Sequence, residues 1–104
     1  MELTDTLLSS LSELLDENEI GVTRLTPRPR GARLTDQAQQ EIQRVLAALE
    51  AAPPAEASLV YANGCFTARR FADAAAVYQQ ILKRRPAHPD AGFNLGLAYL
   101  RLKK

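Results

Sequence analysis

The sequence predicts an all-α protein of about five helices. Apolar residues recur every three or four positions in several segments, and prolines and glycines separate those segments. No stretch of useful length alternates with period two, so no sheet is expected. At 104 residues the chain fits one domain, which can bury roughly two-thirds of the surface that it exposes when unfolded.

The first predicted element is an acidic amphipathic helix within residues 1–19. This segment carries six acids and no base. Its apolar stripe consists of Leu7, Leu8, Leu11, Leu14 and Leu15. Thr4 or Asp5 is expected to cap its start by accepting a hydrogen bond from a free backbone N–H group.

Residues 20–34 are predicted to be a linker rich in arginine and proline. Its prolines and Gly31 interrupt regular structure, and its four arginines are Arg24, Arg28, Arg30 and Arg33. These arginines allow an alternative function, in which the arm at 24–33 binds nucleic acid or another anionic partner. Nucleic acid is not favoured, because no aromatic residue interleaves with the arginines and the net charge is only +1.

A second helix is predicted from Thr35 or Asp36 to about Ala51, before the Pro53–Pro54 pair. Its apolar stripe consists of Ile42, Val45, Leu46 and Leu49. Three more helices are predicted at about 55–68, 71–84 and 89–103. Residues 35–104 are therefore expected to form the main helical domain.

The last three predicted helices carry a spaced pattern of small and aromatic residues. The pattern comprises Phe71, Ala74, Tyr78 and Pro86 in FADAAAVYQQILKRRP, and Leu95, Gly96 and Tyr99 in LGLAY. Ala62, Ala74 and Gly96 are small where helix axes have to approach closely. In these positions residues 55–104 resemble the tetratricopeptide repeat (TPR), a pair of antiparallel helices that stacks into a superhelix. The resemblance implies one full repeat at 55–88 and a half repeat at 89–104.

The resemblance also implies a partner-binding groove along the first helix of each repeat. The groove would be lined by Leu59, Asn63, Phe66, Phe93, Asn94, Leu97, Leu100 and Arg101. In the family, Asn63 and Asn94 match two positions of a clamp for a peptide carboxylate. Leu59 stands where that clamp has a lysine, so an apolar groove is expected instead.

The final predicted helix carries two apolar stripes, Leu95, Tyr99 and Leu102 on one side and Phe93, Leu97 and Leu100 on the other. A helix that is apolar nearly all round is expected to be covered on most sides. Three candidates for what covers this helix remain. They are another polypeptide, including a second copy bound through this helix, the chain's own N-terminal helix, and a further helix of a longer parent chain.

Catalytic and metal-binding motifs are not found. The single histidine, His88, lies between two prolines, and the single cysteine, Cys65, has no partner for a disulfide. No metal-ligand spacing, nucleophile motif or phosphate loop occurs, so no enzyme, cofactor or metal is expected. No segment has the ~20 apolar residues of a membrane span, and the lone cysteine favours the cytoplasm. The expected function is a non-enzymatic interaction module, such as an adaptor or a chaperone-like protein.

Overall fold

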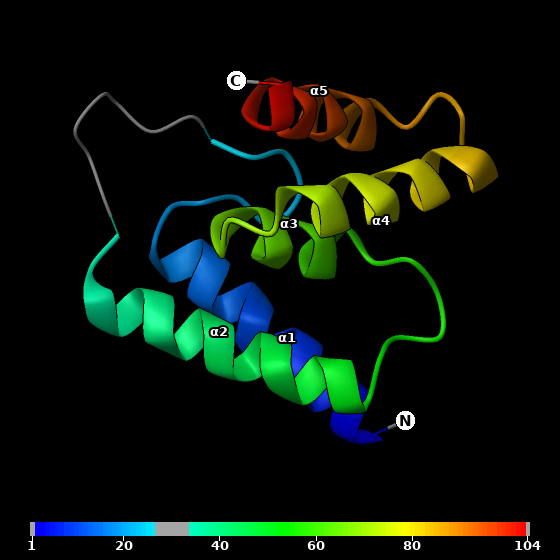
Figure 1. The fold of residues 1–104 in the computed structure, drawn as a ribbon. Coiled ribbons are helices and arrows are strands. Elements are labelled where there is room, and N and C mark those ends of the chain that lie inside the picture. The colour runs from blue at the N-terminus through cyan, green and yellow to red at the C-terminus, as the bar shows by residue number, and fades with distance from the viewer. Residues whose placement is uncertain (1, 27–33, 104) are drawn as a thin grey trace.

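The computed structural model describes residues 2–26 and 34–103, and these residues form five helices and no strand (Figure 1). The helices are α1 (Glu2–Glu17), α2 (Asp36–Ala51), α3 (Leu59–Thr67), α4 (Phe71–Arg84) and α5 (Pro89–Lys103). The predicted all-α fold with about five helices is therefore confirmed.

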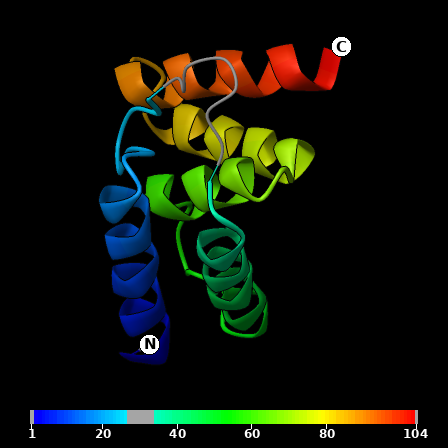
Figure 2. The ribbon, with the colours of Figure 1, turned by 90° about the vertical axis from the view of Figure 1, so that its left-hand side faces the viewer.

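Helices α3, α4 and α5 are stacked in chain order and run in alternating directions, whereas α1 and α2 lie side by side against α3 (Figures 1 and 2). The antiparallel pair α1 and α2 lies at one end of the molecule, and α5 lies at the other end (Figure 2). The short helix α3 is central, because it contacts each of the other four helices. Helix α5 contacts only α3 and α4 among the described helices.

The starts of α2 and α3 follow the available capping side chains. The hydroxyl of Thr35 accepts a bond from the N–H group of Ala38 at 3.1 Å, which fixes the start of α2 where it was predicted. Helix α3 begins at Leu59 rather than near residue 55, because Ser58 provides its cap. The predicted cap of α1 was wrong. Helix α1 begins at Glu2, and the hydroxyl of Thr4 instead donates to the carbonyl of Ala52 at 2.8 Å.

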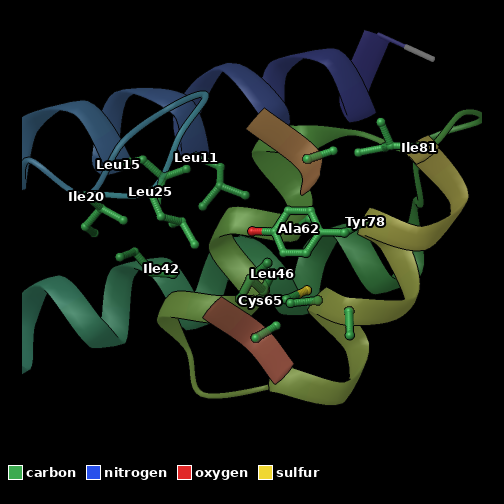
Figure 3. Close-up of a cluster of buried hydrophobic side chains, with 14 of the residues drawn as sticks. Leu11, Leu15, Ile20, Leu25, Ile42, Leu46, Ala62, Cys65, Tyr78 and Ile81 are labelled. Carbon is green, nitrogen blue, oxygen red and sulfur yellow. The ribbon is translucent and has the colours of Figure 1, made fainter. Parts of the chain in front are cut away.

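One hydrophobic core connects the two ends of the molecule (Figure 3). Leu11 and Leu15 of α1 are fully buried, and the ring of Tyr78 from α4 lies in the same cluster. The α2 stripe also reaches the core, with Ile42, Leu46 and Leu49 fully buried and Val45 packed at the edge. The two predicted stripes thus face the core as expected, because leucine spacing and helix period agree.

The residues predicted to pack the repeat divide into two groups. Ala62, Ala74 and Tyr78 are fully buried, and Phe71 packs edge-on against Phe66 with ring centroids 5.1 Å apart. Leu95 is half-buried, whereas Pro86, Gly96 and Tyr99 are exposed. The exposure on α5 follows from its position at the end of the stack, where only α3 and α4 contact it.

The N-terminal helix folds back onto the domain, but not over α5. It packs against α2 and α3 and makes no contact with α5. The three ion pairs of the described residues use Asp90, Glu50 and Glu56, so none of them uses an acid of α1. The outer side of α5 is therefore not covered by the chain's own N-terminal helix.

Candidate functional site

The eight residues predicted to line a groove come from α3 and α5, and the structure separates them by exposure. Asn63 and Asn94 are fully buried. Leu59, Phe66 and Leu97 are half-buried, and Phe93, Leu100 and Arg101 are exposed. The centre of the predicted groove is closed, because the chain's own residues 20–26 are bound to the two asparagines.

Asn63 projects from the middle of α3 and binds three consecutive backbone carbonyls. Its amide nitrogen lies 3.0–3.3 Å from the carbonyl oxygens of residues 21–23. Its amide oxygen accepts from the hydroxyl of Tyr78 and, at 3.0 Å, from the amide nitrogen of Asn94. Burial raises the pKa of the Tyr78 hydroxyl, so Tyr78 remains a hydrogen-bond donor well above neutral pH.

Asn94 completes the same network from α5. Its amide nitrogen donates to the carbonyl of Thr23 at 2.8 Å, and its amide oxygen accepts from the N–H group of Leu25 at 2.9 Å. Burying a side-chain amide costs free energy unless it is hydrogen-bonded. In both asparagines the amide nitrogen and the amide oxygen each have a hydrogen-bond partner. The asparagine pair therefore joins α3, α4, α5 and the loop into one unit.

Residues 20–26 form a compact loop, which we call the plug loop. The N–H group of Thr26 donates to the carbonyl of Ile20 at 2.7 Å, which closes the loop, and Ile20 and Leu25 both enter the core. Gly21 has a φ of 113°, and a Cβ atom there would lie 2.3 Å from the carbonyl oxygen of Arg24. Only glycine fits this turn without strain.

Sequence reasoning assigned the plug loop to a linker and missed its contact with the asparagines. Two signals were present in the sequence. Ile20 and Leu25 are large aliphatic residues in a segment that is otherwise rich in proline and arginine. Asparagine is disfavoured inside helices unless its side chain has a specific partner, and both Asn63 and Asn94 lie within helices.

Arg24 is the member of the predicted basic arm that the structure describes. Its Nε atom lies 3.1 Å from a carboxylate oxygen of Asp90, and its guanidinium lies 4.7 Å from the ring centroid of Phe93. Arg28, Arg30 and Arg33 lie outside the described residues. The guanidinium of Arg24 is therefore engaged within the molecule.

The open part of the predicted groove continues onto the solvent side of α5. We define the outer face of α5 as Gly92, Phe93, Gly96, Tyr99, Leu100 and Lys103. Helical period places these residues opposite Ala91, Asn94 and Ala98, which are buried. Leu100 is 66% exposed, and a Cβ atom added to Gly92 or Gly96 would have no neighbouring atom within 4 Å. The outer face is thus a mainly apolar surface with a row of glycines between larger side chains.

A second surface feature lies at the opposite end of the molecule. A shallow groove of about 270 Å³ runs between α1 and α2. Leu14 and Val45 provide its apolar residues, while Glu13, Glu17 and Glu41 provide acidic ones and Arg44 one base. We call this feature the α1–α2 groove. Its charge is opposite to that of the last turns of α4 and α5, which carry only basic charged residues.

The two side chains with catalytic potential are used structurally. Burial raises the pKa of the Cys65 thiol to about 11, so at neutral pH it is not the thiolate that a nucleophile requires. The Nδ1 atom of His88 accepts from the N–H group of Ala91 at 3.1 Å and so caps the first turn of α5. Among the described residues, no three His, Cys, Asp or Glu side chains are grouped as metal ligands would be.

Neither membrane insertion nor similarity to known proteins points to a function. Within residues 2–26 and 34–103, no helix combines the length and apolar character needed to cross a membrane. No family model, curated protein or solved structure matches the chain. The function is therefore inferred from the surfaces described above.

Proposed function

We propose that this protein is a non-enzymatic interaction module, adaptor-like or chaperone-like, that binds another polypeptide through the outer face of α5. One observation carries the proposal. Of the large hydrophobic side chains that are exposed in the described residues, Phe93, Tyr99, Leu100 and Leu102 belong to α5, and only Leu3 lies elsewhere. Exposed apolar side chains gathered on one helix are typical of an interaction surface rather than of a solvated face.

The shape of the outer face favours a helical partner. Gly92 and Gly96 are one turn apart, lie between Phe93 and Leu100 on one side and Tyr99 on the other, and have open space where their Cβ atoms would be. Packed helices need interaxial distances of about 8–10 Å, and small residues at the crossing point permit the closest approach. An amphipathic helix therefore fits this surface better than an extended segment does.

The proposal retains the TPR-like interpretation of α3, α4 and α5. Support comes from their alternating directions and from the burial of Ala62, Ala74 and Tyr78, the positions that the resemblance assigns to packing. The plug loop fills the centre of the predicted groove, so the proposed binding surface shifts outward along α5. We place the protein in the cytoplasm, because its single cysteine is buried and unpaired.

The test compares two exposed leucines. Leu100→Asp puts a charge in the outer face, whereas Leu3→Asp makes the same change on α1, where the exposed fraction is a similar 61%. Candidate partners are captured from a lysate with the wild-type protein, identified, purified, and titrated against both variants. We expect Leu100→Asp to weaken binding at least about tenfold and Leu3→Asp to leave it unchanged.

Circular dichroism on both variants checks that each one is folded. Equal loss of binding in the two variants, or no loss in either, would place the partner somewhere other than the outer face. Binding that depends on Arg28, Arg30 and Arg33 and falls steeply with salt would favour the anionic-partner alternative.

A further inference from the structure

We propose that the outer face of α5 docks into the α1–α2 groove of a second copy of this chain, so that copies associate head to tail. This inference rests on the proposed function and names its partner. Two observations support a second copy: the charges of the two surfaces are complementary, and the surfaces lie at opposite ends of one molecule.

The charges of the two surfaces are of opposite sign. Helix α1 carries five acids and no base. Within the described residues neither Glu13 nor Glu17 has an ion-pair partner, although both line the α1–α2 groove. The outer face of α5 carries Lys103 and no acid, and Arg101 adds a second positive charge in the same last turn. Opposite potentials of this kind steer association and fix the orientation of the partners.

The apolar parts of the two surfaces also match. A groove between two antiparallel helices can accept the ridge of a third helix. Leu14 and Val45 offer apolar contact within the α1–α2 groove, and Leu100 is the most exposed apolar side chain of α5. The open space around Gly96 allows the backbone of α5 to come close to the rim of the groove.

The positions of the two surfaces exclude pairing within one molecule. Helices α1 and α2 lie at one end of the stack and α5 lies at the other, without contact between them (Figures 1 and 2). The two surfaces are different, so the contact is heterologous, and a pair of copies still has one free outer face and one free groove. Association of this type produces rings or open chains rather than a closed two-fold dimer.

The experiment measures mass by sedimentation velocity over protein concentrations from about 1 to 500 μM. The wild-type chain is expected to exceed its monomer mass of 11.4 kDa as concentration rises. The increase should diminish between about 50 and 500 mM salt, because exposed charges are screened.

Two double variants test the outer face and the α1–α2 groove separately. Leu100→Asp with Lys103→Glu disables the outer face, and Glu13→Lys with Glu17→Lys disables the groove. All four side chains are exposed, so these changes should leave the fold intact. Each variant alone should be monomeric. An equimolar mixture should form a species of twice the monomer mass, because one variant retains the groove and the other retains the outer face.

Two controls address folding and location. Gly96→Gln blocks close approach while raising helix propensity, so any loss of association cannot come from unfolding of α5. Leu3→Asp should associate like the wild type, because Leu3 does not line the groove.

A wild-type chain that remains monomeric at every concentration would overturn the inference. So would a mixture of the two variants that stays monomeric. A variant with Glu13→Lys and Glu17→Lys that associates on its own would also overturn it, because a two-fold contact between α5 helices would give that result. The chain could instead be monomeric and bind a purified partner, with binding lost in Leu100→Asp. That result would overturn the head-to-tail contact and leave the proposed function standing.

Discussion

At the scale of single residues, the two buried asparagines explain how three helices and a loop are held in register. Asn63 and Asn94 have no exposed surface, and every polar atom of their side chains has a partner. A buried polar network of this kind is stable only when all of its members are satisfied. Removing Asn63 leaves the carbonyls of residues 21 and 22 in the plug loop without this partner.

Asn63→Leu is therefore expected to lower the free energy of unfolding by about 3 kcal/mol or more. The leucine is similar in size but leaves the carbonyls of residues 21 and 22 and the Tyr78 hydroxyl without the Asn63 partner, and only the carbonyl of Thr23 keeps a bond, from Asn94. Urea unfolding measures the change. The control Gln40→Leu, at an exposed site on α2, should stay within about 0.5 kcal/mol of the wild type. A loss below about 1 kcal/mol for Asn63→Leu would show that water replaces the amide.

At the scale of helices, α3 and α5 use glycine in opposite environments. A Cβ atom on Gly64 of α3 would lie 2.8 Å from a methyl carbon of Leu11 and 3.2 Å from one of Leu46. Both leucines are fully buried and have little room to move. Gly96 of α5 has no neighbour within 4 Å of the same position. Gly64 thus permits close packing of α3, whereas Gly96 faces open solvent.

Substitution by alanine should change stability with opposite sign at the two glycines. Gly96→Ala is expected to stabilise the protein by about 0.5–1 kcal/mol, because alanine is the better helix former and meets no obstacle. Gly64→Ala is expected to destabilise it by about 1 kcal/mol or more, because overpacking outweighs the same gain. Thermal unfolding of both variants checks the signs. Stabilisation by Gly64→Ala would mean that Leu11 and Leu46 can shift without cost.

At the scale of the whole molecule, one core links the acidic end to the basic end. Leu11 and Leu15 of α1 belong to the same buried cluster as Tyr78 and Ile81 of α4 (Figure 3). The plug loop adds Ile20 and Leu25 to it. Because the core is continuous, the N-terminal segment and the three C-terminal helices should unfold together rather than as separate domains.

Leu11→Ala tests this cooperativity. The substitution should lower the free energy of unfolding by about 2–5 kcal/mol, as buried leucine truncations do. All three tyrosines lie in α3, α4 and α5, so tyrosine fluorescence reports only on that part of the molecule. The tyrosine transition in urea should move to lower concentration together with the circular dichroism transition. A tyrosine transition that does not move would show that the N-terminal helices unfold independently.

The helices themselves could be predicted because each depends on local information. Leucine spacing indicated α1, the Thr35 cap and Pro53–Pro54 indicated α2, and the spacing of Ala74 and Tyr78 indicated the packed side of α4. The candidate site was predicted only in part. The groove positions lie on α3 and α5 as expected, but their exposure depends on residues about 40 to 70 positions away in the chain.

Local sequence was enough to specify the helical class, the helix order and the buried faces of α1 and α2, because helix period and capping act over a few residues. The packing of the helices against one another decides which groups the two asparagines bind. It also decides which face of α5 remains exposed. Hydrogen bonds from Asn63 and Asn94 join the plug loop to α3 and α5, and these contacts exist only once the chain has folded. The folded arrangement also places the α1–α2 groove and the outer face of α5 at opposite ends of the molecule, where only another molecule can bring two such surfaces together.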